Sequence, residues 1–463
     1  MKIFLIEIKG NSNFAHNGLA YLIGNLSAVH EIKIFDLNVS DMTESELLEK
    51  IKKEKPNLIG FSMKSFNLNR TIEFAKKIKQ ISDAKLAIGG PHITLCAKDF
   101  FLKDNKGVFD FGFQGEAELS FAGFCDFFTD SEKYKNIKGL IYKDGNVWVF
   151  NPKPVLENLD ELKFPDFACF YEKIDFEKQG GYPLLTSRGC PYQCIYCSVS
   201  KVSGKKWRAR TAENVIFELK QAILSFGIKE FKIIDDNFTF DIDRAKKFCE
   251  ILIKENLNLK WSCPNGLRAD RIDSELAELM QKSGCRAVSL GIESGDEKVF
   301  NFINKGEKLE DIKKAAKILK KADIEVSGFF IIGLPFETKK SIKKSLKFIE
   351  NLGINHIKWN MLVPYPETFL WNWVLKNGRF LKSFTEGQHF SKMNSVRPVF
   401  ETSDYTAKER IAFYKTANLS TGAYVYVFKI PKNKFLFYLK YTVFLLRYNP
   451  ILLFKKAAKK IFF

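Results

Sequence analysis

The segment Thr186-Ser-Arg-Gly-Cys190-Pro-Tyr-Gln-Cys194-Ile-Tyr-Cys197-Ser198 carries three cysteines at Cys-x3-Cys-x2-Cys spacing. Thiolates this close in sequence can reach a single metal centre. A 4Fe-4S cluster has four irons, and each prefers a thiolate, so three cysteines leave one iron open to bind a small molecule. The spacing therefore predicts that Cys190, Cys194 and Cys197 hold a cluster at which chemistry takes place.

Two other interpretations of the triplet are less favourable. A structural zinc site needs four closed ligands, and no Cys or His follows Cys197 until Cys249. Cysteine also packs as a small hydrophobic residue in protein cores. That interpretation suits the six scattered cysteines, which are Cys96, Cys125, Cys169, Cys249, Cys263 and Cys285.

The size and cysteine content limit the class of protein. A chain of 463 residues with 46% hydrophobic residues is long enough for two or three domains with sizeable cores. Nine cysteines with one tight cluster indicate a reducing compartment and metal binding rather than a disulfide framework. The first ten residues, MKIFLIEIKG, are typical of a strand and not of a signal peptide, so we expect a cytoplasmic protein.

Residues 1–135 alternate short apolar runs with amphipathic helical patterns, which predicts a parallel, doubly wound sheet of the Rossmann-like type. Ligands of such sheets bind beyond the carboxyl ends of the strands, where the loops here carry Ser62, Ser65, Gly89, Gly90 and Gly115. A tight turn alone would also explain Gly89-Gly90-Pro91. Strands are expected at 2–8, 31–37, 58–63, 85–90 and 109–115, and helices at 44–55 and 69–81.

Residues 136–180 predict a hairpin that turns at Asp144-Gly145, followed by a proline-bearing linker to the next domain.

Residues 181–370 again alternate strands and helices, and six such units predict a partial (β/α)6 TIM-type barrel. Chemistry in these barrels takes place at the carboxyl ends of the strands, and five of those ends are polar or rich in glycine here. Strands are expected at 182–187, 231–235, 259–263, 287–293, 325–333 and 356–362, and helices at 211–226, 242–255, 274–283, 310–322 and 339–352.

The cysteine triplet, with Tyr196 before its third member, resembles the signature of the radical S-adenosylmethionine (radical SAM) enzymes. The phrases SRGCPYQCIYC, GIESGDEKVFNFINKG and GFFIIGLPFET, with the loops of residues 1–135, resemble the branch that carries an N-terminal cobalamin-binding domain. The resemblance covers residues 1 to about 370. It implies an α/β protein with three cofactors: a 4Fe-4S cluster, S-adenosylmethionine and cobalamin.

The resemblance also implies roles for the barrel residues. Asp235 or Asp236 would meet the amino group of S-adenosylmethionine, Glu293 its ribose and Arg268 its carboxylate, and Tyr196 and the backbone near Gly333 would complete the site. No catalytic residue is expected beyond the cluster ligands.

One segment departs from the family pattern. Many cobalamin proteins hold cobalt through the His of an Asp-x-His-x2-Gly motif, whereas this chain has Asn13-Phe-Ala-His16-Asn-Gly18. We therefore do not expect His16 to be an axial ligand, and His92 beside Pro91 is more typical of a structural residue.

The implied activity is reductive cleavage of S-adenosylmethionine to a 5′-deoxyadenosyl radical, followed by methylation of an unactivated substrate carbon from methylcobalamin. An external one-electron donor such as flavodoxin or ferredoxin is implied. Ring closure or rearrangement without methyl transfer stays open, as does a non-enzymatic carrier or scaffold at the membrane. A methylthiotransferase is disfavoured because residues 1–135 contain only Cys96 and Cys125.

The chain from 371 to 463 is expected to be mainly helical and is strongly basic. After Glu409 there is no acidic residue, whereas eleven lysines and arginines supply more than half of the net charge of +19. The apolar runs are shorter than the roughly 20 residues that span a bilayer. Basic and aromatic residues together favour peripheral contact with anionic lipid and a lipid-linked substrate, although a helix that covers the barrel is an equal alternative. No nucleic-acid partner is expected, because no recognition module is present.

Overall fold

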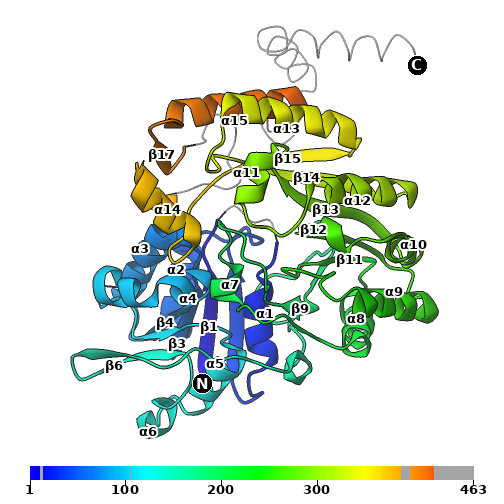
Figure 1. Ribbon diagram of the computed structural model, residues 1–463. Helices are drawn as coiled ribbons and strands as arrows, with labels where there is room; N and C mark the ends of the chain where they lie inside the picture. The colour runs from blue at the N-terminus through cyan, green and yellow to red at the C-terminus, as the bar shows by residue number, and fades with distance from the viewer. Residues whose placement is uncertain (11–13, 106, 387–396, 422–463) are drawn as a thin grey trace, which may run out of the picture.

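Two parallel β-sheets, one from each half of the chain, organise the protein (Figure 1). The computed structural model describes residues 1–10, 14–105, 107–386 and 397–421. The α/β class and the order of the two predicted units along the chain are confirmed. The boundaries at 135, 180 and 370 stay predictions.

The first sheet has seven strands in the order β2-β1-β3-β4-β5-β6-β7, of which the first five are parallel. Successive residues of a strand point to opposite faces, so Phe4 and Ile6 pack with α2 and α3 while Ile3 and Leu5 pack with α1 and α5. The predicted doubly wound sheet is confirmed. The elements are β1 (Lys2–Glu7), α1 (Asn17–Gly24), β2 (Glu31–Asp36), α2 (Glu44–Glu54), β3 (Leu58–Ser62), α3 (Leu68–Lys79), β4 (Lys85–Gly89), α4 (Pro91–Asp99), β5 (Phe111–Phe113) and α5 (Glu118–Asp126).

The predicted hairpin is present as β6 (Leu140–Asp144) and β7 (Val147–Phe150). Gly145 in its two-residue turn has φ 56°, a left-handed conformation that glycine adopts without a steric cost. Strand β6 pairs antiparallel with β5, so the hairpin extends the first sheet and the linker begins after Phe150.

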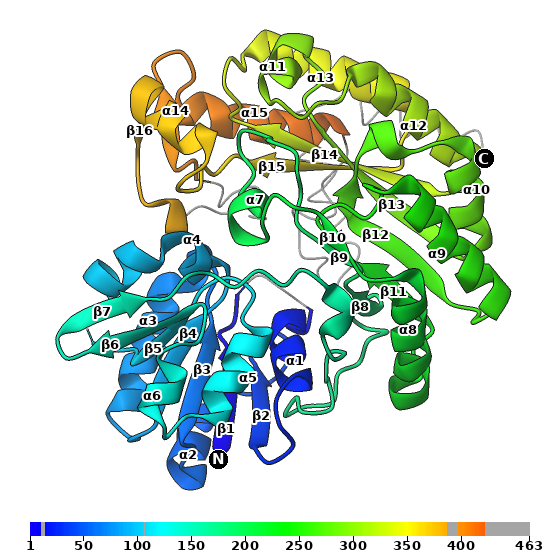
Figure 2. The same ribbon diagram turned by 60° about the horizontal axis from the view of Figure 1, so that its bottom comes forward.

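The second sheet has six parallel strands in the order β15-β14-β13-β12-β11-β8, with helices on its outer side (Figure 2). Within the described ranges β8 and β15 are edge strands, so the sheet is a partial barrel as predicted. The elements are β8 (Tyr182–Leu184), α8 (Ala212–Phe226), β11 (Glu230–Ile233), α9 (Ile242–Glu255), β12 (Lys260–Leu267), α10 (Ser274–Lys282), β13 (Cys285–Glu293), α11 (Glu297–Phe302), α12 (Leu309–Lys321), β14 (Glu325–Ile332), α13 (Lys339–Leu352) and β15 (His356–Met361).

Local sequence signals account for the helix boundaries of the barrel. The side chains of Thr211, Asp241 and Asp273 each accept a hydrogen bond from the N–H three residues later, which satisfies a backbone donor at the start of α8, α9 and α10. Helices α8 and α13 end at Gly227 and Gly353, which are left-handed.

The C-terminal region covers one end of the second sheet. It contains α14 (Phe369–Asn377), the antiparallel pair β16 (Gly378–Phe380) and β17 (Phe400–Thr402), and α15 (Ala407–Thr421), which packs against β15 and α13. The basic and aromatic stretch expected to touch lipid, residues 422–463, lies outside the described residues. No helix in the part of the chain that is described is long and apolar enough to cross a membrane.

Candidate functional site

A pocket of about 460 Å³ opens at the carboxyl ends of the second sheet, and we name it the barrel pocket. All three cysteines of the triplet line it. Its wall also contains most of the other residues that the sequence predicts for this site: Tyr196, Asp235, Asp236, Arg268 and Glu293.

The cysteines lie on a loop between β9 (Ser187–Arg188) and α7 (Val199–Val202). Strand β9 pairs with β10 (Arg208–Ala209), and Cys190 N–H donates to Gly204 O at 3.2 Å, so the base of the loop is closed. The loop is held to the barrel by Ile195 N–H, which donates to Ile303 O at 3.0 Å. Each cysteine is partly exposed to the pocket.

The donor set suits a 4Fe-4S cluster. The three cysteines line one pocket, and a cluster holds each thiolate on a different iron. Burial raises the pKa of Cys194 to about 11 and that of Cys197 to about 12, and coordination to a metal is what deprotonates such thiols.

Asp235 and Asp236 are neighbours with different surroundings. Asp235 is 3% exposed, and its two carboxylate oxygens accept hydrogen bonds from Thr186 and Ser187. Asp236 is accessible from the pocket, although partial removal from water raises the pKa of its carboxyl. Of the two, Asp236 therefore has the carboxylate available to a ligand.

Glu293 ends strand β13 in a left-handed conformation, with φ 63°. Burial raises the pKa of its carboxyl, whereas Lys305, whose Nζ lies 3.8 Å from Glu293 Oε1, and a hydrogen bond from Tyr196 lower it. Positive φ is uncommon for a residue with a side chain, and such strain persists where the surrounding structure imposes it. The strand end thus directs an acceptor into the pocket.

Arg268 and Gly333 both have hydrogen-bond partners within the protein. The Arg268 guanidinium donates to both carboxylate oxygens of Asp270, at 3.0 and 2.9 Å, and to the carbonyl oxygens of Lys305 and Gly306. Gly333 does not line the pocket, and its N–H donates to Glu337 Oε2 at 2.6 Å. A buried acceptor that the sequence did not single out, Asn360 Oδ1, has no partner in the described part of the chain and belongs to the pocket wall.

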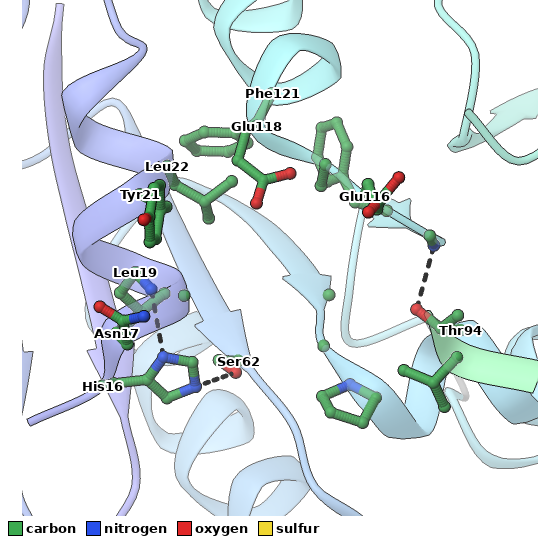
Figure 3. A pocket seen from close by; sticks show the side chains of 18 of the residues that line it. His16, Asn17, Leu19, Tyr21, Leu22, Ser62, Thr94, Glu116, Glu118 and Phe121 are labelled. Carbon is green, nitrogen blue, oxygen red and sulfur yellow. Dashed lines mark hydrogen bonds between the residues drawn. The ribbon is translucent and has the colours of Figure 1, made fainter. Parts of the chain in front are cut away.

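A second pocket, of about 370 Å³, lies at the carboxyl ends of the first sheet, and we name it the sheet pocket (Figure 3). Ser62, Gly89, Gly90 and Gly115 line it, as the sequence predicts. Five glycines in its wall keep side chains out of the space, which leaves room for a bulky ligand between largely apolar surfaces; they are Gly18, Gly60, Gly89, Gly90 and Gly115.

His16 lies at the floor of the sheet pocket with both ring nitrogens engaged (Figure 3). Nδ1 accepts from Leu19 N–H at 3.1 Å and caps α1, so Nε2 carries the proton that is directed at Ser62 Oγ, 2.8 Å away. Burial lowers the pKa of His16 to about 3, which keeps the ring neutral.

Ser65, the remaining predicted residue, lies outside the sheet pocket. It begins the short helix η1 (Ser65–Asn67), and its Oγ lies 3.0 Å from His92 Nδ1. The His92 ring stacks on Phe384 with centroids 6.0 Å apart. Ser65 therefore belongs to a contact between the first sheet and the C-terminal region.

The two pockets adjoin. Asp236 lines both, and Ser203 and Arg188, which come from the cysteine-bearing half of the chain, also line the sheet pocket. Arg188 pairs there with Glu116 and Glu118, a contact that sequence analysis did not find. Opposite charges give no signal of pairing in the sequence when about 70 residues separate them.

Comparisons with known proteins agree with this arrangement. The Radical SAM superfamily model matches residues 184–349, and the B12 binding domain model matches residues 8–124. The chain is 31% identical over 408 residues to an uncharacterized methyltransferase of Pyrococcus horikoshii, which covers 87% of this chain and 86% of the relative. It is 27% identical over 409 residues to an anaerobic magnesium-protoporphyrin IX monomethyl ester cyclase of Rubrivivax gelatinosus, which covers 85% of this chain and 71% of the relative.

The fold is also similar to that of a solved structure, the radical S-adenosylmethionine methyltransferase TsrM from Kitasatospora setae with cobalamin and a [4Fe-4S] cluster bound. The TM-score is 0.74 at 17% identity, with 91% of this chain and 88% of that chain covered. The domain matches and the relative at 31% identity show that this chain belongs to the cobalamin-dependent radical SAM enzymes, the family that uses a 4Fe-4S cluster, S-adenosylmethionine and cobalamin.

Proposed function

We propose that the protein methylates an unactivated carbon of a small-molecule substrate, with S-adenosylmethionine and the cluster in the barrel pocket and cobalamin in the sheet pocket. The observation that carries this proposal is that Asp236 forms part of the wall of both pockets. A methyl group and a substrate carbon can meet only if the two cofactor sites adjoin, and a shared wall provides that proximity.

When bound, the cluster and S-adenosylmethionine supply a radical at the substrate carbon, and cobalamin supplies the methyl group. The residues of this chain hold and orient the reactants. Cys190, Cys194 and Cys197 would hold three irons of the cluster, which would leave the fourth iron for a ligand. Asp236 is the carboxylate available for a ligand amino group, and Glu293 is the acceptor for ribose hydroxyls.

Other residues of the barrel pocket have supporting roles. Arg268 donates hydrogen bonds to Asp270 and to two carbonyl oxygens. We therefore propose that it stabilises the pocket wall and does not bind a ligand carboxylate. The apolar side of the pocket suits an adenine ring and excludes water from the reacting groups. Its members are Phe329, Ile331, Met361, Leu362 and Val363.

Mass spectrometry of the products tests this function. The protein is prepared anaerobically with iron, sulfide and hydroxocobalamin, then given S-adenosylmethionine and a reductant. Methyl transfer predicts both 5′-deoxyadenosine and S-adenosylhomocysteine. 5′-Deoxyadenosine alone would indicate a ring-forming or rearranging reaction, the second candidate, which the similarity to the cyclase favours. Neither product would indicate a carrier or scaffold and would overturn the proposal.

The basic tail motivates a more specific proposal, that the substrate is lipid-linked and that the cytoplasmic protein works at the inner face of the membrane. Its support is the composition of residues 422–463 alone, where aromatic side chains and lysines occur together and no acid is present. Binding to anionic liposomes at low salt, and loss of activity on truncation after Pro431, are the expected results. A truncated protein of unchanged activity, together with a full-length protein that does not bind liposomes, would refute it.

Flavodoxin or ferredoxin is the proposed electron donor.

A further inference from the structure

We propose that Arg188 is a positioning residue that fixes the sheet pocket relative to the barrel pocket through ion pairs with Glu116 and Glu118. This inference rests on the proposed function, because it takes the two pockets as the cobalamin and S-adenosylmethionine sites.

The arginine joins two segments of the chain, and each segment borders one of the pockets. Arg188 lies on β9, two residues before Cys190, and its Nη2 lies 2.7 Å from Glu118 Oε1. Its Nη1 lies 3.3 Å from Glu116 Oε1. Both glutamates follow Gly115 after β5: Glu116 lies in the loop and Glu118 begins α5 (Figure 3). The Arg188 side chain therefore connects the strand that leads into the cysteine loop with the wall of the sheet pocket.

A second arginine strengthens this connection. Arg208, on the neighbouring strand β10, places Nη1 2.6 Å from Glu116 Oε2 and donates through Nη2 to Ser203 O at 2.8 Å. The same Glu116 oxygen accepts from Leu156 N–H at 3.1 Å. Glu116 thus holds both strands of the β9–β10 pair and the linker together.

The four charged side chains form a balanced and buried group. Two glutamates face two arginines, and the side chains of Arg188, Glu116, Glu118 and Arg208 are 11%, 11%, 10% and 4% exposed. The ring of Tyr21 on α1 lies beneath the Arg188 guanidinium, 5.6 Å from its centroid. Buried ion pairs have defined geometry, and removal of one partner leaves the other charge buried and uncompensated.

The location gives this group a role in positioning. Arg188, Glu116 and Glu118 all line the sheet pocket, and Asp236 lines both pockets. A shift of Arg188 therefore moves the wall of one pocket and the loop that begins the other. Misplacement of reacting groups by about 1 Å can cost on the order of a hundredfold in rate.

A matched ion pair provides the control. Lys206, just before β10, pairs with Glu157 in the linker, but these side chains are 70% and 62% exposed. Exposed pairs contribute little to structure. Lys206→Met should therefore behave as the wild type, whereas Arg188→Lys, Arg188→Met and Glu118→Gln remove parts of the buried group.

The test uses the full chain, loaded anaerobically with the cluster and hydroxocobalamin. Iron and cobalamin content show whether each site fills, and pulsed electron paramagnetic resonance (EPR) measures the coupling between the reduced cluster and cob(II)alamin. Arg188→Lys and Glu118→Gln should fill both sites but show a broader range of cluster–cobalt distances. The S-adenosylhomocysteine formed per 5′-deoxyadenosine should fall on the order of tenfold.

Two results would overturn the inference or its basis. Variants at Arg188 and Glu118 with the wild-type distance distribution and product ratio would refute the positioning role. Arg188→Met that fails to fold would leave Arg188→Lys and Glu118→Gln to decide. Wild-type protein that takes up no cobalamin would instead refute the proposed function. The cobalamin content of the wild type therefore separates this result from a failure of the positioning role.

Discussion

Thr186 donates two hydrogen bonds to Asp235, from its N–H at 2.6 Å and from its Oγ1 at 2.5 Å. Both residues are buried, and Thr186 lies four residues before the first cysteine of the triplet. Asp235 thus ties the end of β11 to the segment that leads into the cysteine loop. The bond pattern indicates support for the loop rather than ligand binding.

Asp235→Asn should destabilise the protein by about 2–4 kcal/mol, because a buried carboxylate that accepts three hydrogen bonds becomes a weaker acceptor. Thermal unfolding measures the stability and iron analysis measures cluster binding. The unfolding temperature and the amount of bound iron should both fall. Asp236→Asn is the matched control, with a change of about 0.5 kcal/mol or less, because its side chain faces the pockets. Equal loss of stability in both variants would contradict this assignment.

Replacement of any one of Cys190, Cys194 and Cys197 by Ala should reduce bound iron to a small fraction of the wild-type amount and abolish 5′-deoxyadenosine formation, because a cluster held by two thiolates is lost. Iron analysis and visible absorbance follow the loss. Cys285→Ala is the control: this cysteine is buried in the barrel core, so we expect about 1 kcal/mol of destabilisation and unchanged iron. A cysteine variant that still cleaves S-adenosylmethionine at the wild-type rate would refute the site.

The EPR spectrum of bound cob(II)alamin should lack coupling to a histidine nitrogen, because Leu19 N–H and Ser62 Oγ engage both ring nitrogens of His16. Labelling with ¹⁵N-histidine tests this directly. His16→Ala should leave the cobalt spectrum unchanged while it destabilises the protein by about 1 kcal/mol through loss of the α1 cap. A nitrogen splitting that disappears in His16→Ala would show that the histidine ligates cobalt.

Glu293→Gln should weaken S-adenosylmethionine binding to the cluster-loaded protein by roughly tenfold to a hundredfold, the loss expected when a charged acceptor of about 1.5–3 kcal/mol becomes neutral. Isothermal titration provides the dissociation constants. Glu297→Gln, at an exposed position four residues later, should bind as the wild type does. An unchanged affinity in Glu293→Gln would remove this residue from the site.

Glu337→Gln should change the pH dependence of stability. Burial raises the pKa of Glu337 to about 7, above its ordinary value of 4.5, so the folded state binds more protons than the unfolded state between these pH values. The wild type therefore loses stability as the pH rises from about 4.5 through 7, on the order of 2–3 kcal/mol. Glutamine cannot ionise, yet its carbonyl oxygen can still accept from Gly333 N–H.

Urea unfolding of the apoprotein between pH 5 and pH 8 measures this difference. The variant should gain stability relative to the wild type as the pH rises. Burial also raises the pKa of Glu7 to about 7, so both proteins should still lose some stability over this pH range. Glu350→Gln on the exposed side of α13 controls for loss of a glutamate. Parallel stability curves for wild type and Glu337→Gln would contradict the prediction.

Sequence analysis predicted the parts of the fold that depend on local patterns. Helix α9 spans residues 242–255 as predicted, because Asp241 caps its first turn and Asn256 ends it in a left-handed conformation. Ser65 and Gly333, by contrast, follow strands as ligand-binding residues do but turn to partners within the protein, His92 and Glu337. No sequence pattern distinguishes a loop residue that faces a ligand from one that faces a neighbouring side chain.

The sequence by itself determined the alternation of strands and helices, the helix caps and the cysteine spacing, since each depends on residues a few positions apart. Only the tertiary structure decided that Asp236 belongs to two pockets, that Asp235 supports the cysteine loop, and that Arg188 pairs with Glu116 and Glu118. These relationships join residues about 50 to 70 positions apart in sequence or two different sheets. They exist because apolar residues of the first sheet and of the barrel share one core, and burial of that core brings the carboxyl ends of the two sheets together.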